Sequence, residues 1–71
     1  MSIVQWNCRG VKPNFEEIKS ILSDHNPVAV CLQETFLKDT DTINFKGYDM
    51  YSSFSVSARD GRPIGGTSVL V

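Results

Sequence analysis

Cysteine and histidine are scarce in this sequence. Its 71 residues include two cysteines and one histidine. Cys8 and Cys31 do not form a Cys-x-x-Cys pair, so a structural zinc site is not indicated. Both cysteines lie in apolar runs, which favours buried, reduced thiols of an intracellular protein.

Excess positive charge and long apolar runs are also absent. Seven Lys and Arg against eight Asp and Glu leave a formal net charge of −1. Nucleic-acid-binding faces are usually basic, so the composition alone does not indicate one. It does not exclude one either, because a basic groove could lie outside these residues. The longest apolar run, residues 28–32, is too short to span a bilayer, and no membrane partner is expected.

The first part of the chain predicts a strand followed by a helix. Residues 2–8 are rich in strand-forming side chains, and a glycine follows them closely. Asn14 and Glu17 have the spacing of a helix N-cap and its capping-box partner. Asn26, which precedes a proline, ends the helix. The apolar face of this predicted helix consists of Phe15, Ile18, Ile21 and Leu22.

Residues 28–33 predict a second strand. Their continuous apolar run favours a strand that is buried on both faces, as in a parallel sheet. A strand, a helix and a strand with short connections form a right-handed βαβ unit. Residues 48–56 and 67–71 predict two further strands, with a turn-rich segment between them. We therefore expect an α/β fold, and a sequence that stops within an apolar strand predicts a fragment.

Aromatic and basic side chains outside this unit have simple structural interpretations. Trp6, Tyr48 and Tyr51 are expected to pack in strands. Arg59 and Arg62 flank a predicted turn and could contact a DNA phosphate. A solvated turn is the simpler interpretation, because arginine side chains are mostly exposed.

Polar residues end both strands of the predicted βαβ unit. Asn7 ends the first strand, and Gln33 and Glu34 end the second. The carboxyl ends of parallel strands meet at one edge of the sheet, where α/β proteins bind ligands. Amide and carboxylate oxygens suit Mg²⁺. Polar residues at these positions also fit ordinary strand ends, because a chain usually turns in contact with water.

Three segments resemble signature segments of the endonuclease/exonuclease/phosphatase superfamily. They are residues 3–10 (IVQWNCRG), residues 30–37 (VCLQETFL) and the glycine-led strand of residues 65–71 (GGTSVLV). The sequences of these segments are most like those in the endonuclease domains of jockey-like non-LTR retrotransposons. The resemblance covers nearly the whole chain in order and spacing. It implies that residues 1–71 are the N-terminal part of one DNase I-like α/β sandwich, with no second domain.

The resemblance also implies a metal-dependent hydrolysis of DNA phosphodiester bonds. Glu34 matches the family's metal ligand, and Asn7 matches a residue that lines the same catalytic site. The implied cofactor is Mg²⁺ or Mn²⁺, and the implied partner is DNA, nicked in the nucleus by a longer protein that also carries a reverse transcriptase. No protein partner is predicted. The family's later catalytic segments are not among these residues, so the 71-residue chain alone is expected to be inactive.

Two alternatives stay open at this point. A phosphatase of phosphoinositides or other phosphate esters would use the same metal edge. A truncated remnant would keep the motifs but lack a general base. Residues 23–25 spell the Ser-Asp-His triplet that the family carries near its end. They precede the second strand, which places them at the wrong end of the sheet, and His25 is expected to be a helix-end residue.

Overall fold

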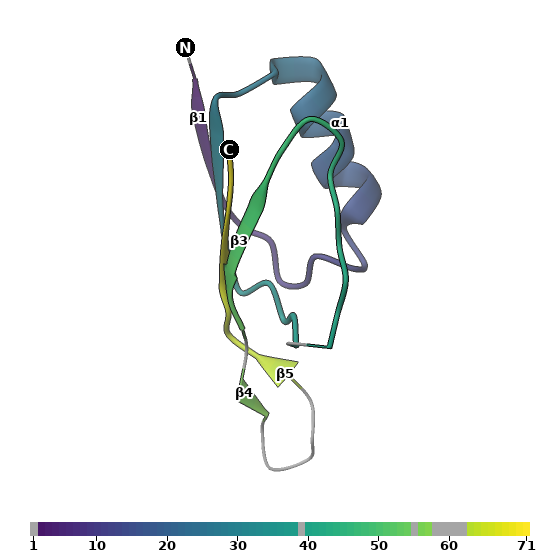
Figure 1. Ribbon diagram of the computed structural model, residues 1–71, viewed down its shortest axis with the longest axis vertical. Coiled ribbons are helices and arrows are strands. Elements are labelled where there is room, and N and C mark those ends of the chain that lie inside the picture. Colours follow the sequence, from purple (N-terminus) through teal and green to yellow (C-terminus); the bar gives the residue numbers. More distant parts are fainter. Residues whose placement is uncertain (1, 39, 55, 58–62) are drawn as a thin grey trace.

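One helix packs against one face of a four-stranded sheet, and a separate two-stranded pair lies beyond one end of that sheet (Figure 1). This computed structural model describes residues 2–38, 40–54, 56–57 and 63–71. Within them, no helix has the length and apolar character that crossing a membrane requires. The elements are β1 (Ile3–Asn7), α1 (Phe15–His25), β2 (Ala29–Gln33), β3 (Met50–Ser53), β4 (Val56–Ser57), β5 (Pro63–Ile64) and β6 (Thr67–Leu70).

The sheet confirms the predicted α/β architecture. Its strand order is β1-β2-β6-β3. Strands β1 and β2 are parallel, with Ile3 opposite Ala29 and Asn7 opposite Gln33. Strand β6 runs antiparallel to both of its neighbours. The helix therefore connects two adjacent parallel strands, as a βαβ unit requires, and the carboxyl ends of β1 and β2 lie side by side.

The ends of α1 lie where the sequence predicts them. Asn14 precedes the first helical residue, and Asn26 ends the helix in the left-handed conformation, with a φ of 43°. The Asn26 amide donates to the Leu22 carbonyl at 3.0 Å, which satisfies one of the last helical carbonyls. The capping-box prediction was wrong, because the Asn14 side chain makes no hydrogen bond to the helix amides.

The apolar core lies between α1 and the face of the sheet that the helix covers. Ile18 on the helix is 1% exposed, and Val30 and Leu32 on β2 are equally buried. Burying side chains of this size contributes about 1.5–3 kcal/mol each. The other core residues are Cys8, Val11, Leu22, Leu37, Phe45 and Leu70, with Trp6 packed against them as predicted.

The opposite face of the sheet is open within the described residues. Ile3 is 68% exposed and Tyr51 is 65% exposed, while Cys31 is half-buried. The prediction that β2 is buried on both faces was therefore wrong for this chain, as was the prediction that Tyr51 packs. The physical reason is that the one described helix covers one face, and strand geometry sends alternate side chains to the other.

The third predicted strand is shorter than residues 48–56. A turn, in which the Tyr48 amide donates to the Phe45 carbonyl at 3.1 Å, precedes β3. Strand β4 pairs with β5 and leaves the main sheet. The predicted last strand is confirmed as β6. Arg59 and Arg62, expected in a solvated turn, lie outside the described residues.

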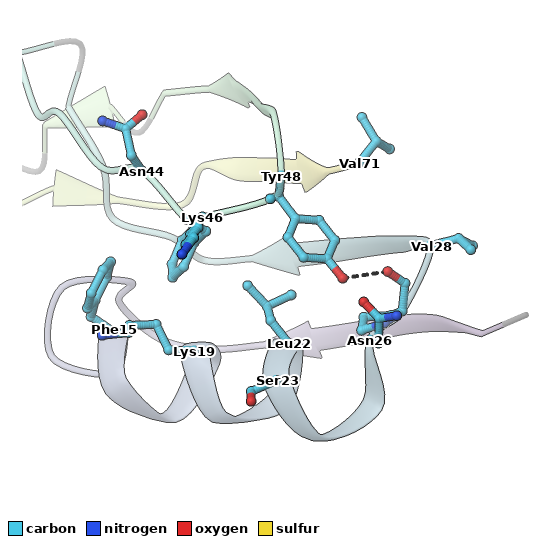
Figure 2. A pocket seen from close by; sticks show the side chains of 13 residues that line it. Phe15, Lys19, Leu22, Ser23, Asn26, Val28, Asn44, Lys46, Tyr48 and Val71 are labelled. Carbon is cyan, nitrogen blue, oxygen red and sulfur yellow. Dashed lines mark hydrogen bonds between the residues drawn. The ribbon is translucent and has the colours of Figure 1, made fainter.

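Tyr48 joins the segment before β3 to the end of the helix. Its hydroxyl donates to the Pro27 carbonyl oxygen at 2.6 Å, across a groove of about 630 Å³ between α1 and residues 44–48 (Figure 2). Phe15 and Phe45 stack in the same groove, with ring centroids 4.8 Å apart. The hydroxyl and the rings together hold this irregular segment against the helix.

We expect Tyr48→Phe to lower the free energy of unfolding by about 1 kcal/mol, because it removes one partly buried hydrogen bond and leaves the Pro27 carbonyl unpaired. Urea denaturation followed by circular dichroism measures the change. The matched control is Tyr51→Phe, at a tyrosine that is 65% exposed. Equal denaturation midpoints for the two variants would contradict a stabilising role for the Tyr48 hydroxyl.

Candidate functional site

Parallel pairing between the first two strands continues past the ends of both. Asn7 lies opposite Gln33 in the last pair of the β1–β2 register. Three further backbone hydrogen bonds then join the segment after β1 to the segment after β2. They run from the amides of Cys8, Gly10 and Val11 to the carbonyls of Gln33, Glu34 and Thr35, at 3.0, 2.8 and 3.0 Å.

The segment after β2 is also held from its other side. The amide of Thr35 donates to the carbonyl of Gly66 at 3.2 Å, and that of Phe36 donates to Gly65 at 3.0 Å. Glu34 and Phe36 have positive φ values of 52° and 57°. Side chains other than glycine reach this left-handed region at a cost of about 1–3 kcal/mol. Hydrogen bonds on both sides therefore hold Glu34 in a conformation that it would not favour alone.

Asn14 holds the segment after β1 in place. Its side-chain amide donates to the Cys8 carbonyl at 2.8 Å and to the Gly10 carbonyl at 2.9 Å. Both amide protons are committed to this loop. The side chain points back to the loop instead of capping the helix, which is why the predicted capping box is not made.

Gly10 allows the loop to turn beneath Pro13. Its φ is 111°, and a Cβ atom there would lie 2.9 Å from Cγ of Pro13 and 3.5 Å from Phe36. A larger residue would therefore be strained by its backbone conformation and would also clash. The glycine that marks the strand end in the sequence is required by the shape of the site.

The Cys8 side chain is buried between the two segments. The residue is 3% exposed, and its Sγ lies 3.6 Å from the Gln33 carbonyl oxygen and 3.9 Å from that of Glu34. Burial raises the pKa of the Cys8 thiol, and the Glu34 charge acts in the same direction, while backbone hydrogen bonds oppose it. The thiol is therefore protonated at neutral pH, which suits a structural residue and not a nucleophile or a metal ligand.

Two oxygen donors remain available at this edge. Asn7 is exposed and Glu34 is half-buried. Neither side chain has a hydrogen-bond or ion-pair partner among the described residues. A carboxylate and an amide are the hard oxygen donors that Mg²⁺ prefers. The described residues contain no group of three His, Cys, Asp or Glu side chains that could hold a metal, so water and phosphate oxygens would complete the coordination of a metal bound here.

Thr35 lies at this edge of the sheet, and His25 lies at the opposite end. Thr35 directly follows Glu34 and is 1% exposed, and its hydroxyl has no partner in the described part of the chain. Unpaired buried polar groups are uncommon outside functional or strained sites. His25 is exposed at the carboxyl end of α1. This is the opposite end of the sheet, where the Val28 amide donates to the Ser2 carbonyl at 2.9 Å, as the sequence predicts.

An ion pair that the sequence did not predict ties the two loops together. Lys12 Nζ contacts Asp41 Oδ1, and the Lys38 amide donates to Asp41 Oδ2 at 2.8 Å. The hydrogen bond from Lys12 lowers the pKa of the Asp41 carboxyl, and the Lys38 amide adds to this effect. No sequence signal joins Lys12 to Asp41, because 29 positions separate them.

Comparison with known proteins identifies the family. Residues 4–71 match the endonuclease/exonuclease/phosphatase family. The chain belongs to this family. It is 32% identical over 71 residues to the RNA-directed DNA polymerase from mobile element jockey of Drosophila melanogaster, and the match covers all of this chain and 7% of that protein. The chain therefore spans a small part of this relative.

A solved structure supports the fold. The chain superposes on an AP endonuclease from Archaeoglobus fulgidus with a TM-score of 0.67 and 17% identity, covering 94% of this chain and 26% of that structure. The family membership and the incomplete DNase I-like α/β architecture that the sequence predicted are both confirmed. In this endonuclease/exonuclease/phosphatase chain, the metal roles of Asn7 and Glu34 stay predictions.

We expect Asn14→Asp to lower the free energy of unfolding by about 2–3 kcal/mol. A carboxylate cannot donate to the two carbonyls that Asn14 binds, and it repels them. Thermal unfolding followed by circular dichroism measures the loss. Asn44→Asp, at an exposed loop position, introduces the same charge and serves as the control. A midpoint for Asn14→Asp equal to that of the control would show that the loop does not depend on Asn14.

We also expect iodoacetamide to label Cys31 of the native protein well before Cys8. Cys8 is buried with a raised pKa, whereas Cys31 is half-buried on the open face, and alkylation requires an accessible thiolate. Mass spectrometry of digested samples at timed intervals follows each site. Cys8 should react at the rate of Cys31 once the protein is unfolded in urea. Equal rates in the native protein would contradict the buried position of Cys8.

Proposed function

We propose that this chain supplies the first part of the active site of a Mg²⁺-dependent endonuclease, which nicks target DNA for a non-LTR retrotransposon. The observation that carries the proposal is the Glu34 carboxylate, which has no hydrogen-bond or ion-pair partner in the described part of the chain and is held beside the end of β1 by hydrogen bonds on both sides of its segment. Family membership supports hydrolysis of a phosphate ester. The name of the Drosophila relative, an RNA-directed DNA polymerase from a mobile element, supports DNA as the substrate.

The proposed mechanism assigns separate roles to the two donors. Glu34 would hold Mg²⁺ or Mn²⁺ through its carboxylate, and Asn7 would orient the metal or the phosphate through its amide. The metal, when bound, supplies a positive charge that polarises the phosphoryl oxygens. Because the backbone hydrogen bonds already fix Glu34, little reorganisation would accompany substrate binding.

The rest of the reaction would depend on residues outside this chain. A general base must take a proton from the attacking water, and another group must stabilise the leaving oxygen. His25 is too far from the proposed site to do either, and Cys8 is buried and protonated. We therefore propose that the endonuclease activity, and the reverse transcription that follows it, belong to a longer protein.

We expect Glu34→Gln to slow plasmid nicking by the full-length protein by about 100-fold, because the metal loses its charged ligand. Nicking is measured on agarose gels with Mg²⁺, and EDTA should abolish it. Glu17→Gln, the same change at an exposed helix position, is the control and should nick at the wild-type rate.

The same preparation is then assayed on a soluble phosphate monoester. Nicking of DNA without hydrolysis of the monoester is the expected result. A Glu34→Gln protein that nicks as fast as the wild type would disprove the role of Glu34. A protein that hydrolyses the monoester and leaves plasmid intact would replace the endonuclease proposal with a phosphatase.

A further inference from the structure

A pocket of about 450 Å³ adjoins the Glu34 edge of the sheet. It lies between the loop after β1 and the loop after β2, and its wall includes Gly10, Lys12, Thr35, Lys38 and Asp41. It begins beside the proposed metal ligand, because Thr35 follows Glu34 directly and the Gly10 amide donates to the Glu34 carbonyl. The pocket therefore lies next to the segment that carries Glu34.

The pocket contains more positive than negative charge. Its wall has two lysines and one carboxylate, which leaves 2 − 1 = +1. Asp41 is fully committed, since Oδ1 contacts the Lys12 ammonium and Oδ2 accepts the Lys38 amide. The charge of the Lys38 ammonium also acts on Asp41, but this ammonium makes no hydrogen bond or ion pair among the described residues. Lys12 donates one of its three N–H groups to Asp41 and keeps the others for a ligand.

Asp41 contacts Lys12 through its ammonium and Lys38 through its backbone. Its own amide donates to the Lys38 carbonyl at 3.0 Å. The Asp41 side chain is 12% exposed and that of Lys12 is 58% exposed. The Asp41 carboxylate is thus largely covered, whereas the Lys12 side chain stays open to solvent.

We propose that this pocket binds a backbone phosphate of the DNA strand, next to the phosphate that is cleaved at the Glu34 edge. The inference rests on the proposed function, because it needs a nucleic-acid strand at that edge. Lys12 and Lys38 bind the phosphate as point charges, which positions the strand without reading its sequence. Asp41 holds Lys12 in place and offsets part of its positive charge.

The test measures DNA binding without cleavage. Fluorescence anisotropy of a labelled short duplex, in EDTA and across a series of salt concentrations, gives the slope of log affinity against log salt. Lys12→Ala and Lys38→Ala should each reduce the slope by about 1 and weaken binding about 10-fold near 0.1 M salt. Lys46→Ala, at an exposed lysine that lines the separate groove beside α1, should leave both values unchanged.

The variant Asp41→Asn distinguishes a phosphate site from a structural ion pair. An asparagine still accepts the Lys38 amide but removes the charge that offsets Lys12, so DNA binding should tighten several-fold. Opposite shifts for Lys12→Ala and Asp41→Asn support the proposal. If both variants shift the DNA affinity in the same direction, or if the slope against salt does not change, the proposal is overturned. Lys12→Arg, which keeps the charge, should retain the wild-type slope and provides the comparison if Lys12→Ala is unfolded by circular dichroism.

Nicking assays separate this inference from the proposed function. If Glu34→Gln abolishes nicking while the lysine variants bind DNA like the wild type, the pocket is not a phosphate site and the endonuclease stands. If the wild-type protein neither binds nor nicks DNA, both proposals fail. Loss of monoester hydrolysis in Lys12→Ala, without any change in DNA binding, would assign the pocket to a small phosphate ester and overturn the DNA assignment.

Discussion

The candidate site depends on one constraint, which is the pairing of residues 33–36 on both of their sides. Backbone amides from the loop after β1 bind their carbonyls, and the carbonyls of Gly65 and Gly66 bind their amides. A strand end is normally free to fray, because nothing pairs with it past the last residue of the sheet. Here the pairing continues through the turn, and Glu34 keeps a left-handed backbone that a free loop would abandon.

Other residues around this edge help to hold the paired backbone in place. The Asn14 side chain binds two loop carbonyls, Gly10 fits under Pro13, and the Cys8 thiol fills the space below. Each of these residues acts on the backbone and not on a ligand. The ion pair of Lys12 and Asp41 joins the outer parts of the same two loops. A rigid framework of this kind lets the Glu34 carboxylate hold a defined position.

Local signals were sufficient for the βαβ unit of this endonuclease/exonuclease/phosphatase chain. The period of apolar residues and the pair Asn26-Pro27 set the helix, and the apolar run of residues 28–33 set the central strand. Position within the βαβ unit then predicted that polar residues end two adjacent strands, and the register places Asn7 opposite Gln33, directly before Glu34. These features depend on neighbours close in sequence or on a general rule of parallel sheets, so the sequence by itself determined them.

Only the tertiary structure decided the finer contacts. The Asn14 side chain had a local option, the helix amides, and a distant one, the loop carbonyls, and packing of the loop against β2 selected the second. The helix lies over one face of the sheet, which left Tyr51 of β3 exposed on the other face. Lys12 meets Asp41 across 29 positions. No short-range pattern records such contacts, because the energy that selects them comes from surfaces that meet only after the chain has folded.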